Sequence, residues 1–329
     1  MKAVFLDYNT IGPKDLDLGP LFECLPELEL FDATSNDEVP KRIHDVEYIL
    51  TNKVVLNASN LEAVKNLKFI GLTATGADNI DLNYTKENNI RVCNIRSYCS
   101  QSVVEHIFGV LFNLTHNIGY YRDLATNGAW QKGDDFCLLN HSIRELSSMK
   151  IGIIGYGELG KSVAKMAKNF GMCVLINTRS TACLKDGEES IPLSSLLAEA
   201  DIVSLHCPLT DKTKNLIGKE ELDLMKSSAI LINTARGALI DSQALYTALT
   251  EKKIAAAAID VLPQEPPTDG NVLLNYKEKN LIVTPHIAWA TVEARQNGIN
   301  QLAETVRAFQ AGKKPVSYTH LTLPTIYSV

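Results

Sequence analysis

The most informative stretch of the sequence is Lys150-Ile151-Gly152-Ile153-Ile154-Gly155-Tyr156-Gly157-Glu158-Leu159-Gly160. Its apolar beginning is typical of a buried strand, and residues 161–170 have the pattern of a helix. In the G-x-G-x-x-G turn between them, the first glycine permits a tight turn, the second lets a pyrophosphate approach the backbone, and the third lets helix and strand pack closely. The helix N-terminus then faces the phosphates. The pattern predicts a dinucleotide-binding domain, and a glycine-rich turn without a ligand is the plainer alternative.

The strand expected next, at 174–177, should indicate which dinucleotide is bound. Such a strand normally ends in an acid roughly 20 residues beyond the glycines, where the carboxylate binds the adenosine ribose hydroxyls. Here Thr178 and Arg179 stand in its place. Because arginine and hydroxyl side chains suit a 2′-phosphate, the sequence favours NADP, or the use of both NAD and NADP. A solvated surface charge is the alternative interpretation of Arg179.

Strand and helix patterns alternate on both sides of the glycine-rich turn. Strands are expected at 4–6, 48–51, 69–72, 91–94, 151–154, 174–177, 202–205, 229–233, 256–260 and 281–284. Helices are expected at 61–67, 102–121, 161–170, 241–250 and 294–311. Strands separated by helices imply parallel sheets covered on both faces, so the pattern predicts an α/β protein with two βα domains. Residues 127–149 show no clear period, and we interpret them as an arm or an interface segment.

Length and charge bound the class of protein. The chain of 329 residues is long enough for two cores, and 45% apolar with 21% charged residues is a globular composition. Because 32 Lys and Arg stand against 38 Asp and Glu, the net charge of -6 argues against a nucleic acid or an anionic membrane as partner. No run approaches the roughly 18 apolar residues of a membrane span, and Asp7 interrupts any signal peptide. We therefore expect a soluble, cytoplasmic protein.

The cysteines point to the same compartment. There are seven of them, irregularly spaced, and no Cys-x-x-Cys pair occurs. This pattern indicates neither a disulfide framework nor a zinc site, so we expect no bound metal and a reducing environment. Most of the cysteines are interpreted as small buried apolar side chains.

Three polar residues follow expected strands in the second half of the chain. They are Arg236 in Asn233-Thr234-Ala235-Arg236-Gly237, Glu265 in Pro263-Gln264-Glu265-Pro266-Pro267, and His286 after Pro285. Ligands of open α/β sheets bind at the carboxyl ends of the strands, where these residues fall. An arginine can hold the carboxylate of a 2-keto acid, a histidine can protonate the forming alkoxide, and a carboxylate can orient the histidine. Singly, each has a plainer interpretation as a loop ion pair or a buried histidine. Together with a dinucleotide turn, they predict a hydride-transfer site.

Several motifs together resemble the D-isomer-specific 2-hydroxyacid dehydrogenases. They are the glycine turn at 155–160, His206-Cys207-Pro208-Leu209-Thr210, Asn233-Thr234-Ala235-Arg236-Gly237, Ala258-Ile259-Asp260-Val261 and Pro285-His286-Ile287-Ala288-Trp289. The resemblance runs from Met1 to about Val316. Within the family, Thr51-Asn52-Lys53, Asp135-Phe136-Cys137 and residues 286–291 are most similar to the glycerate dehydrogenase (hydroxypyruvate reductase) branch.

The resemblance implies two Rossmann-like domains, each with a parallel sheet. Residues 1–98 and 287–316 would form a discontinuous, flavodoxin-like substrate domain, and residues 99–286 the NAD(P)-binding domain, with the substrate in the cleft between them. The family is generally homodimeric, which would make the 127–149 segment a dimer arm. Residues 317–329 have neither helical period nor charge, and we interpret them as a non-native tail.

The resemblance also implies roles for particular residues. His286 would be the general acid, backed by Glu265, and Arg236 would hold the substrate carboxylate. The substrate would also contact Asn52 and the backbone of Ala74, Thr75 and Gly76. The cofactor-binding residues would be Gly155, Tyr156, Gly157, Glu158, Leu159, Gly160, Thr178, Arg179, His206, Cys207, Pro208, Thr213, Thr234, Ala235, Asp260 and Ala288. Among these, Asp260 would contact the nicotinamide carboxamide. The cofactor would be NAD(P)(H), and the partners a small 2-keto or 2-hydroxy acid and a second copy of the chain.

The substrate that best fits the resemblance is hydroxypyruvate or glyoxylate, with D-glycerate or glycolate as the product. The same chemistry on D-lactate or 3-phosphoglycerate is one alternative; for a phosphorylated substrate, only Lys53 and Arg96 are evident extra cations. A nucleotide-sensing binding protein, like the corepressors that share this fold, is another, although nothing resembles an added recruitment segment. Arg96 stands where many relatives carry proline, and the sequence offers no functional account of it.

Overall fold

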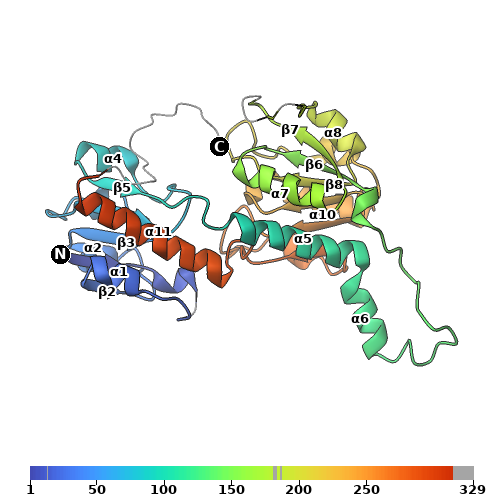
Figure 1. Cartoon of the computed structure of the whole chain (residues 1–329), viewed down its shortest axis with the longest axis horizontal. Helices are drawn as coiled ribbons and strands as arrows, with labels where there is room; N and C mark the ends of the chain where they lie inside the picture. The colour runs from blue at the N-terminus through green and yellow to red at the C-terminus, as the bar shows by residue number, and fades with distance from the viewer. Residues whose placement is uncertain (13, 181–183, 186, 314–329) are drawn as a thin grey trace. The chain divides into compact units, whose positions relative to one another are not determined.

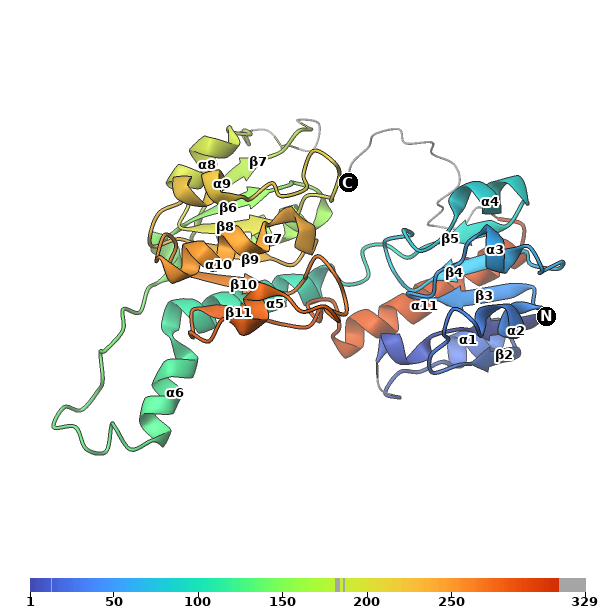
Figure 2. The ribbon, with the colours of Figure 1, turned by 180° about the vertical axis from the view of Figure 1, so that it is seen from behind.

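The structure is a computed structural model that describes residues 1–12, 14–180, 184–185 and 187–313. The chain divides into two compact units (Figure 1 and Figure 2). We call Met1–Cys99 together with residues 289–313 the terminal unit, and Ser100–Ala288 the central unit. The tail expected at 317–329 lies outside the described residues. No helix in the described part of the chain is long and apolar enough to cross a membrane.

The terminal unit is built on a five-stranded parallel sheet in the order β2-β1-β3-β4-β5 (Figure 1). Its strands are β1 (Lys2–Phe5), β2 (Glu27–Leu30), β3 (Tyr48–Thr51), β4 (Phe69–Leu72) and β5 (Arg91–Cys93). The order is the flavodoxin-like one, so the predicted fold class of this part is confirmed. Its switch point, where the chain changes direction across the sheet, lies between β1 and β3.

Helices from both ends of the chain cover this sheet. On one face lie α1 (Gly19–Cys24) and α11 (Val292–Gln310), whose side chains Ile299, Leu302 and Val306 are fully buried against the strands. On the other face lie α2 (Val39–Ile43), α3 (Ala58–Leu61) and α4 (Leu82–Glu87). The Arg295 guanidinium of α11 makes two bonds of 2.7 Å to the Asp15 carboxylate. One core therefore combines residues from the two ends of the sequence.

The central unit is built on a six-stranded parallel sheet in the order β11-β10-β9-β8-β6-β7 (Figure 2). Its strands are β6 (Lys150–Ile154), β7 (Cys173–Asn177), β8 (Ile202–Leu205), β9 (Ile230–Asn233), β10 (Ala256–Ile259) and β11 (Leu281–Val283). On one face pack α8 (Leu193–Glu199), α9 (Lys219–Leu224) and α10 (Ser242–Thr250). On the other pack α5 (Ser100–His116) and α7 (Glu158–Asn169).

The strand order places the glycine-rich turn at a ligand-binding position. Because β7 pairs on one side of β6 and β8 on the other, the chain changes direction across the sheet at β6. In open α/β sheets, ligands bind beyond the carboxyl ends of the strands at such a switch point. The turn at 155–160 follows β6 directly. Parallel sheets in both units confirm the predicted Rossmann-like α/β class.

Two predicted helices are wrong. The one at 102–121 is two helices, because α5 ends at His116 and α6 spans Ile118–Thr126. Asn117 between them has φ 51° and ψ 38°, a left-handed conformation that asparagine tolerates, and its Nδ2 donates to the Ser142 carbonyl at 3.0 Å. The helix at 61–67 is wrong because α3 ends at Leu61, after only one turn.

The segment interpreted as an arm has little regular structure. The sole helical element within residues 127–149 is the 3-10 turn η2 (Leu146–Ser148). Figure 1 shows α6 and this segment extending away from the layers of the central unit. The Trp130 indole donates to the Phe136 carbonyl at 3.1 Å, and the Tyr121 hydroxyl donates to the His141 carbonyl at 2.8 Å. These bonds tie the segment to itself and to α6.

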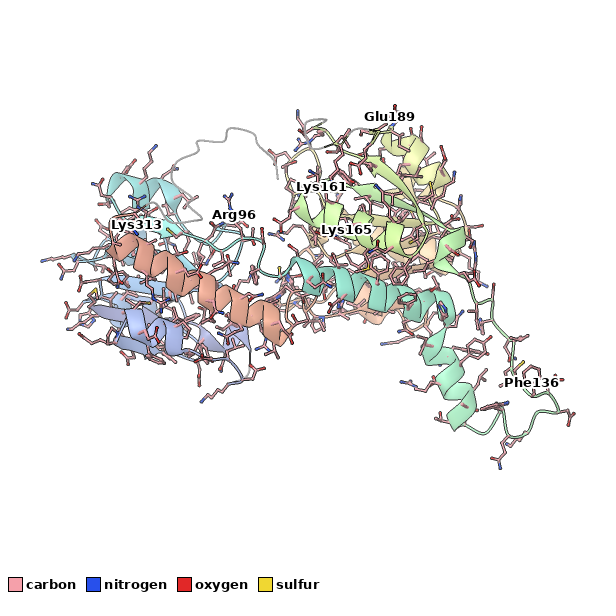
Figure 3. All side chains as sticks on the ribbon, viewed as in Figure 1. Arg96, Phe136, Lys161, Lys165, Glu189 and Lys313 are labelled. Carbon is pink, nitrogen blue, oxygen red and sulfur yellow. The ribbon has the colours of Figure 1, made fainter. Side chains whose placement is uncertain are left out.

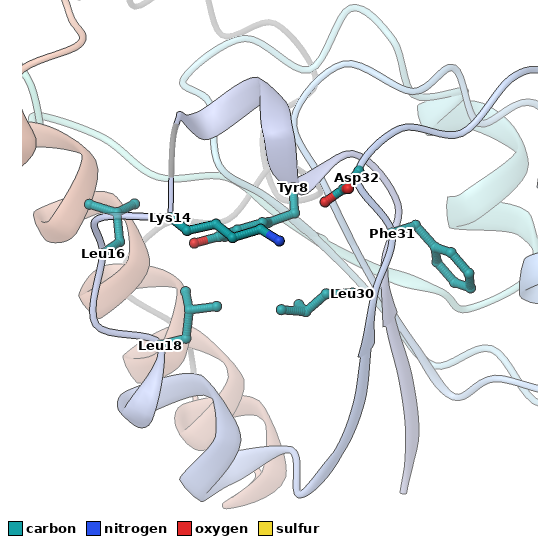
Figure 4. A pocket seen from close by; sticks show the side chains of 7 residues that line it. All are labelled: Tyr8, Lys14, Leu16, Leu18, Leu30, Phe31 and Asp32. Atoms are coloured by element: carbon teal, nitrogen blue, oxygen red, sulfur yellow. The ribbon is translucent and has the colours of Figure 1, made fainter.

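A pocket of about 610 Å³ opens on the terminal unit beside the ends of β1 and β2 (Figure 4). It is lined by Tyr8, Lys14, Leu16, Leu18, Leu30, Phe31 and Asp32. None of the candidate site residues lines it, so this pocket does not belong to the predicted site.

Candidate active site

The three residues predicted to be catalytic lie at one edge of the central sheet. Arg236 follows β9, Glu265 lies in the loop after β10, and His286 follows β11. These strands are parallel neighbours, so their carboxyl ends meet at the same edge. This is the edge at which the glycine turn follows β6, because all six strands run in one direction.

His286 and Glu265 form a hydrogen-bonded pair. His286 Nδ1 lies 2.6 Å from Glu265 Oε2, and the two side chains are 33% and 34% exposed. Glu265 Oε1 also accepts from the Leu262 N–H at 2.8 Å, which holds the carboxylate in the loop. A carboxylate on this nitrogen fixes the orientation of the imidazole and stabilises its protonated form. The pair can therefore give a proton to a substrate oxygen or take one from it.

Asp260 holds the backbone that carries His286. His286 has φ 55°, and its N–H donates to the Asp260 carbonyl at 2.8 Å. The Asp260 carboxylate, whose side chain is 1% exposed, accepts from the N–H groups of Ile287 and Ala288 at 2.9 Å and from the Thr284 hydroxyl at 2.5 Å. In the structure this carboxylate fixes the histidine turn. Its contact with a nicotinamide carboxamide stays a prediction.

Arg236 lies on a rigid turn. The Asn233 side chain closes the turn, since Nδ2 donates to the Arg236 carbonyl at 2.9 Å and Oδ1 accepts from the Ala235 N–H at 3.0 Å. A Cβ at Gly237 would lie 2.0 Å from the carbonyl carbon of Leu262, so only glycine allows this packing. The Arg236 side chain itself is exposed. An exposed guanidinium on a fixed turn suits bidentate binding of a carboxylate.

The glycine-rich turn is closed tightly against its neighbours. Gly155 has φ 92°, and a Cβ there would lie 2.5 Å from the backbone nitrogen of Cys207. A Cβ at Gly160 would lie 2.2 Å from the Gly155 carbonyl oxygen. Gly157 is the N-cap residue of α7 and has no side chain that could cap the first turn of this helix. The Glu158 carboxylate accepts from the Ser100 hydroxyl at 2.7 Å. The turn thus presents backbone N–H groups and the N-terminal end of a helix, which suit a pyrophosphate.

Among the described residues, two buried side-chain polar atoms lack a hydrogen-bond partner, and both lie at this edge. They are Nδ1 of His206, which follows β8, and Oγ1 of Thr234, which follows β9. Burial lowers the pKa of His206 to about 4, so its ring is neutral near neutral pH, with Nε2 2.8 Å from Ser204 Oγ. An unpartnered buried polar atom costs about 1–3 kcal/mol. The residues present therefore fit a ligand with polar groups at the ends of β8 and β9, as a nicotinamide dinucleotide has.

The remaining predicted cofactor residues lie on the same loops. Thr213 Oγ1 donates to the Pro208 carbonyl at 2.7 Å and accepts from the Thr210 N–H at 2.7 Å, so this hydroxyl shapes the loop after β8. Burial raises the pKa of the Cys207 thiol. The Ala288 carbonyl accepts from the Ser102 hydroxyl at 2.7 Å.

In the central unit, no group of three or more His, Cys, Asp and Glu among the described residues is placed to hold a metal ion.

The end of β7 carries the two residues predicted to select the cofactor, Thr178 and Arg179. Arg179 is exposed there, and the Thr178 N–H donates to the Ser190 hydroxyl at 2.9 Å. The segment that follows runs beside β7, with Ser190 paired with Ile176, and its Glu188 accepts from the Tyr156 hydroxyl at 2.6 Å. This contact joins residues far apart in sequence, so the glycine motif alone does not indicate it.

The residues predicted to contact the substrate in the terminal unit follow β3 and β4. Asn52 is buried, and its Nδ2 donates to Thr10 Oγ1 at 3.1 Å. The Asp7 carboxylate accepts from the Asn52 N–H at 2.9 Å and so fixes this loop. The Ala74 carbonyl accepts from the Ile95 N–H at 3.2 Å, and the Thr75 carbonyl accepts from Asn94 Nδ2 at 2.7 Å. Residues 74–76 thus form a braced turn at the carboxyl edge of this sheet.

A sheet edge that joins a phosphate-binding turn to a histidine supported by a carboxylate suits a dehydrogenase that uses a nicotinamide dinucleotide. Comparison with known proteins gives the family. Residues 108–288 match the model of the D-isomer specific 2-hydroxyacid dehydrogenase, NAD binding domain. The chain belongs to the D-isomer-specific 2-hydroxyacid dehydrogenases, which confirms the predicted family, the enzyme class and a nicotinamide cofactor.

Individual relatives cover nearly the whole chain. A glycerate dehydrogenase of Methylorubrum extorquens is 42% identical over 95% of this chain and 97% of its own. A hydroxypyruvate reductase of Blautia hydrogenotrophica is 36% identical over 93% and 97%. Among solved structures, a D-lactate dehydrogenase of Aquifex aeolicus complexed with NAD and lactic acid has a TM-score of 0.81 at 28% identity, covering 98% of this chain and 100% of that one. An acyclic imino acid reductase in complex with NADPH and D-Arg has a TM-score of 0.84 at 29% identity, covering 97% and 100%.

Proposed function

We propose that this dehydrogenase reduces hydroxypyruvate or glyoxylate to D-glycerate or glycolate and catalyses the reverse oxidation. The His286–Glu265 pair, at 2.6 Å, is the observation that carries the proposal, because reduction of a ketone or aldehyde needs a proton donor. The relatives named glycerate dehydrogenase and hydroxypyruvate reductase support the choice of substrate.

Each residue has one part in the proposed reaction. Arg236 holds the substrate carboxylate with two parallel hydrogen bonds and so orients the carbonyl. A bound reduced nicotinamide supplies the hydride. His286, held through Nδ1 by Glu265, gives the proton from Nε2 to the carbonyl oxygen, which completes the hydroxyl group. In the reverse direction the same nitrogen takes the hydroxyl proton.

We assign the central unit to cofactor binding and the terminal unit to substrate binding. The pyrophosphate would lie on the turn at 155–160, with Cys207, Pro208, Ala235, Asp260 and Ala288 along the rest of the cofactor. His206 Nδ1 and Thr234 Oγ1 would gain the hydrogen bonds that they lack in the protein alone. The backbone of residues 74–76 and the loop of Asn52 would meet the substrate. These assignments rest on the position of each residue at a carboxyl edge of its sheet.

Steady-state assays with a panel of acids test the proposed function. Hydroxypyruvate, glyoxylate, pyruvate and 3-phosphohydroxypyruvate are each reduced with NADH and with NADPH. We expect kcat/KM to be largest for hydroxypyruvate or glyoxylate. A larger value for pyruvate or the phosphorylated acid would assign the alternative substrates instead. Binding of the cofactor without reduction of any acid would contradict the proposed reaction and favour a nucleotide-sensing binding protein.

We infer a preference for NADPH from the end of β7, where Arg179 is exposed and an arginine suits the 2′-phosphate. Arg179→Ala should raise the KM for NADPH about 10- to 100-fold, because a charge-assisted hydrogen bond contributes about 1.5–3 kcal/mol, and should leave the KM for NADH within about twofold. The ratio of kcat/KM with the two cofactors is the measurement. Equal effects on both cofactors would identify Arg179 as a surface charge.

We infer a homodimer that forms through the arm at 127–149. Phe136 is 90% exposed and Leu139 79% exposed, and Trp130 and Ile143 expose about half of their surface. Figure 3 shows Phe136 at the far end of this segment. Apolar side chains gathered on one projecting segment are typical of an interface, and a second copy is the occupant the family suggests. We also infer a reducing, cytoplasmic location, in keeping with the six cysteines in the described part of the chain, all of which are free thiols.

Substitution in the arm tests the dimer. The double variant Phe136→Asp with Leu139→Asp should shift the protein from dimer to monomer at micromolar concentration, because it places two charges in an apolar interface. Light scattering coupled to size-exclusion chromatography measures the mass. Leu274→Asp, at another exposed leucine outside the arm, is the matched control and should remain dimeric. A wild-type protein that is monomeric, or an arm variant that stays dimeric, would contradict the assignment.

A further inference from the structure

One face of α5 contacts the turn that carries His286. The helix packs against β10 of the central sheet (Figure 2). Ser102 and His106 are four residues apart, so they lie on the same face of this helix. The Ser102 hydroxyl donates to the Ala288 carbonyl at 2.7 Å, and His106 Nε2 lies 3.3 Å from Thr284 Oγ1. The helix therefore contacts the chain both before and after His286.

The hydrogen bonds of Thr284 determine which ring nitrogen of His106 carries a proton. The Thr284 hydroxyl donates its single proton to Asp260 Oδ1 at 2.5 Å. Towards His106, the Thr284 oxygen can therefore only accept. It follows that Nε2 of His106 is protonated and that the hydrogen bonds run in one direction, from His106 through Thr284 to Asp260.

The Asp260 carboxylate at the end of this chain of hydrogen bonds is buried. Its oxygens also accept from the N–H groups of Ile287 and Ala288, the two residues directly after His286. A buried carboxylate is costly unless it is hydrogen-bonded and paired with a cation. Among the described residues, His106 is the one basic side chain at ion-pair distance from this carboxylate, with Nε2 3.9 Å from Oδ1. A shift of the carboxylate would therefore be transmitted to the backbone beside His286.

His286 depends on this support because of its backbone conformation. Its φ of 55° lies in the left-handed region, which residues other than glycine adopt only at a cost in free energy and only where their surroundings hold them. A proton donor must also lie at hydrogen-bond distance from the atom that it protonates. A small rotation of the turn would therefore slow the reaction without removing any group that reacts.

We propose that His106 is a positioning residue of this dehydrogenase, which holds the His286 turn in its reactive position through Thr284 and Asp260. The Nε2 proton of His106 keeps the Thr284 hydroxyl directed at Asp260, and the Asp260 carboxylate fixes the N–H groups that follow His286. This inference rests on the proposed role of His286 as the proton donor.

Loss of the His106 N–H is the direct test. His106→Phe keeps a ring but cannot donate, so the rate of keto-acid reduction in a single turnover should fall about 3- to 10-fold, the usual effect of one hydrogen bond. Stopped-flow absorbance with hydroxypyruvate and glyoxylate, using NADPH and NADH, measures this rate without the contribution of product release. The steady-state KM for the acid should stay within about twofold, because Arg236 holds the carboxylate. His106→Gln, whose amide N–H can replace the Nε2 proton, should recover most of the lost rate.

A second background separates the hydrogen bond from the packing of the ring. Thr284→Val keeps the shape of the side chain but removes the hydroxyl, so adding His106→Phe to it should change the rate less than about twofold. Equal factors in the two backgrounds, or an unchanged rate when His106→Phe is made in the wild-type enzyme, would overturn the inference.

A matched control and a stability measurement complete the experiment. His116→Phe is the same substitution at the other histidine of α5, whose ring contacts Phe112, and it should keep the wild-type rate. Thermal unfolding shows whether each variant keeps the fold, and His106→Leu, which also lacks the N–H, replaces His106→Phe if that variant is unfolded. The proposed function fails on different results: the wild-type enzyme reduces no acid, or His286→Asn turns over at the wild-type rate.

Discussion

Replacing His286 should reduce the kcat for keto-acid reduction by about 10²–10⁴-fold, which is the usual contribution of a general acid. Because His286 has φ 55°, His286→Asn is the better variant, since asparagine tolerates the left-handed conformation and keeps the turn held by Asp260. His286→Ala should have the same effect on kcat. Fluorescence titration should show that the Kd for NADPH changes less than about threefold, because the histidine is assigned to the substrate.

Replacing Glu265, whose carboxylate binds His286 Nδ1, should also reduce turnover, but by less than replacing His286. Glu265→Gln keeps the length of the side chain but removes the carboxylate that holds the imidazole, so kcat should decrease, though less than in the His286 variants. His44→Ala, at an exposed histidine in the terminal unit, is the control and should keep wild-type kinetics. Wild-type turnover in His286→Asn would refute the assigned acid.

Replacing Arg236 should lower kcat/KM for the keto acid by about 10²–10⁴-fold. Two charge-assisted hydrogen bonds of about 1.5–3 kcal/mol each are lost in Arg236→Ala, and 1.4 kcal/mol is a factor of ten. Arg236→Lys should restore only part of this, because an ammonium is a point charge and cannot form the parallel pair. Steady-state kinetics with hydroxypyruvate and glyoxylate measure the effect.

The turn that carries Arg236 does not depend on the Arg236 side chain, so a loss of activity in these variants can be separated from a loss of stability. The Asn233 side chain and the close packing of Gly237 hold the turn, so truncation of the exposed Arg236 side chain should leave the melting temperature within a few degrees of the wild-type value. Arg122→Ala, at an arginine with 72% of its side chain exposed on α6, is the matched control. A kcat/KM within threefold of wild type in Arg236→Ala would show that another group holds the carboxylate.

The sequence was sufficient to predict the parallel sheets because most strands are continuous buried apolar runs. The strands at 48–51, 69–72 and 202–205 have the predicted bounds, and every residue in them is buried. β2 was missed because Glu27-Leu28-Glu29-Leu30 alternates charged and apolar residues, which is how an edge strand looks when one of its faces is solvated. Local hydrophobicity identifies strands in the middle of a sheet better than those at its edge.

The candidate site likewise has one part that the sequence could predict and one part that it could not. The glycine turn and the three polar residues after β9, β10 and β11 could be predicted, because each depends on residues close together in sequence. The Asp260 contacts that fix the His286 turn, and the bond between Tyr156 and Glu188, could not be predicted, because they join segments that meet only in the folded chain. A motif indicates which side chains are present, and the tertiary structure determines which of them are already bound to another group.

The position of α11 has a consequence for how the protein is made. Ile299, Leu302 and Val306 fill the core of the terminal unit, yet they are translated after all of Ser100–Ala288. Domains fold as units as the chain leaves the ribosome, so the central unit has all of its residues while one face of the terminal sheet still lacks its helix. The terminal unit, whose first strand is translated first, is therefore the last unit to be completed. In the interval, the apolar face that awaits α11 is the surface that a nascent-chain chaperone would bind.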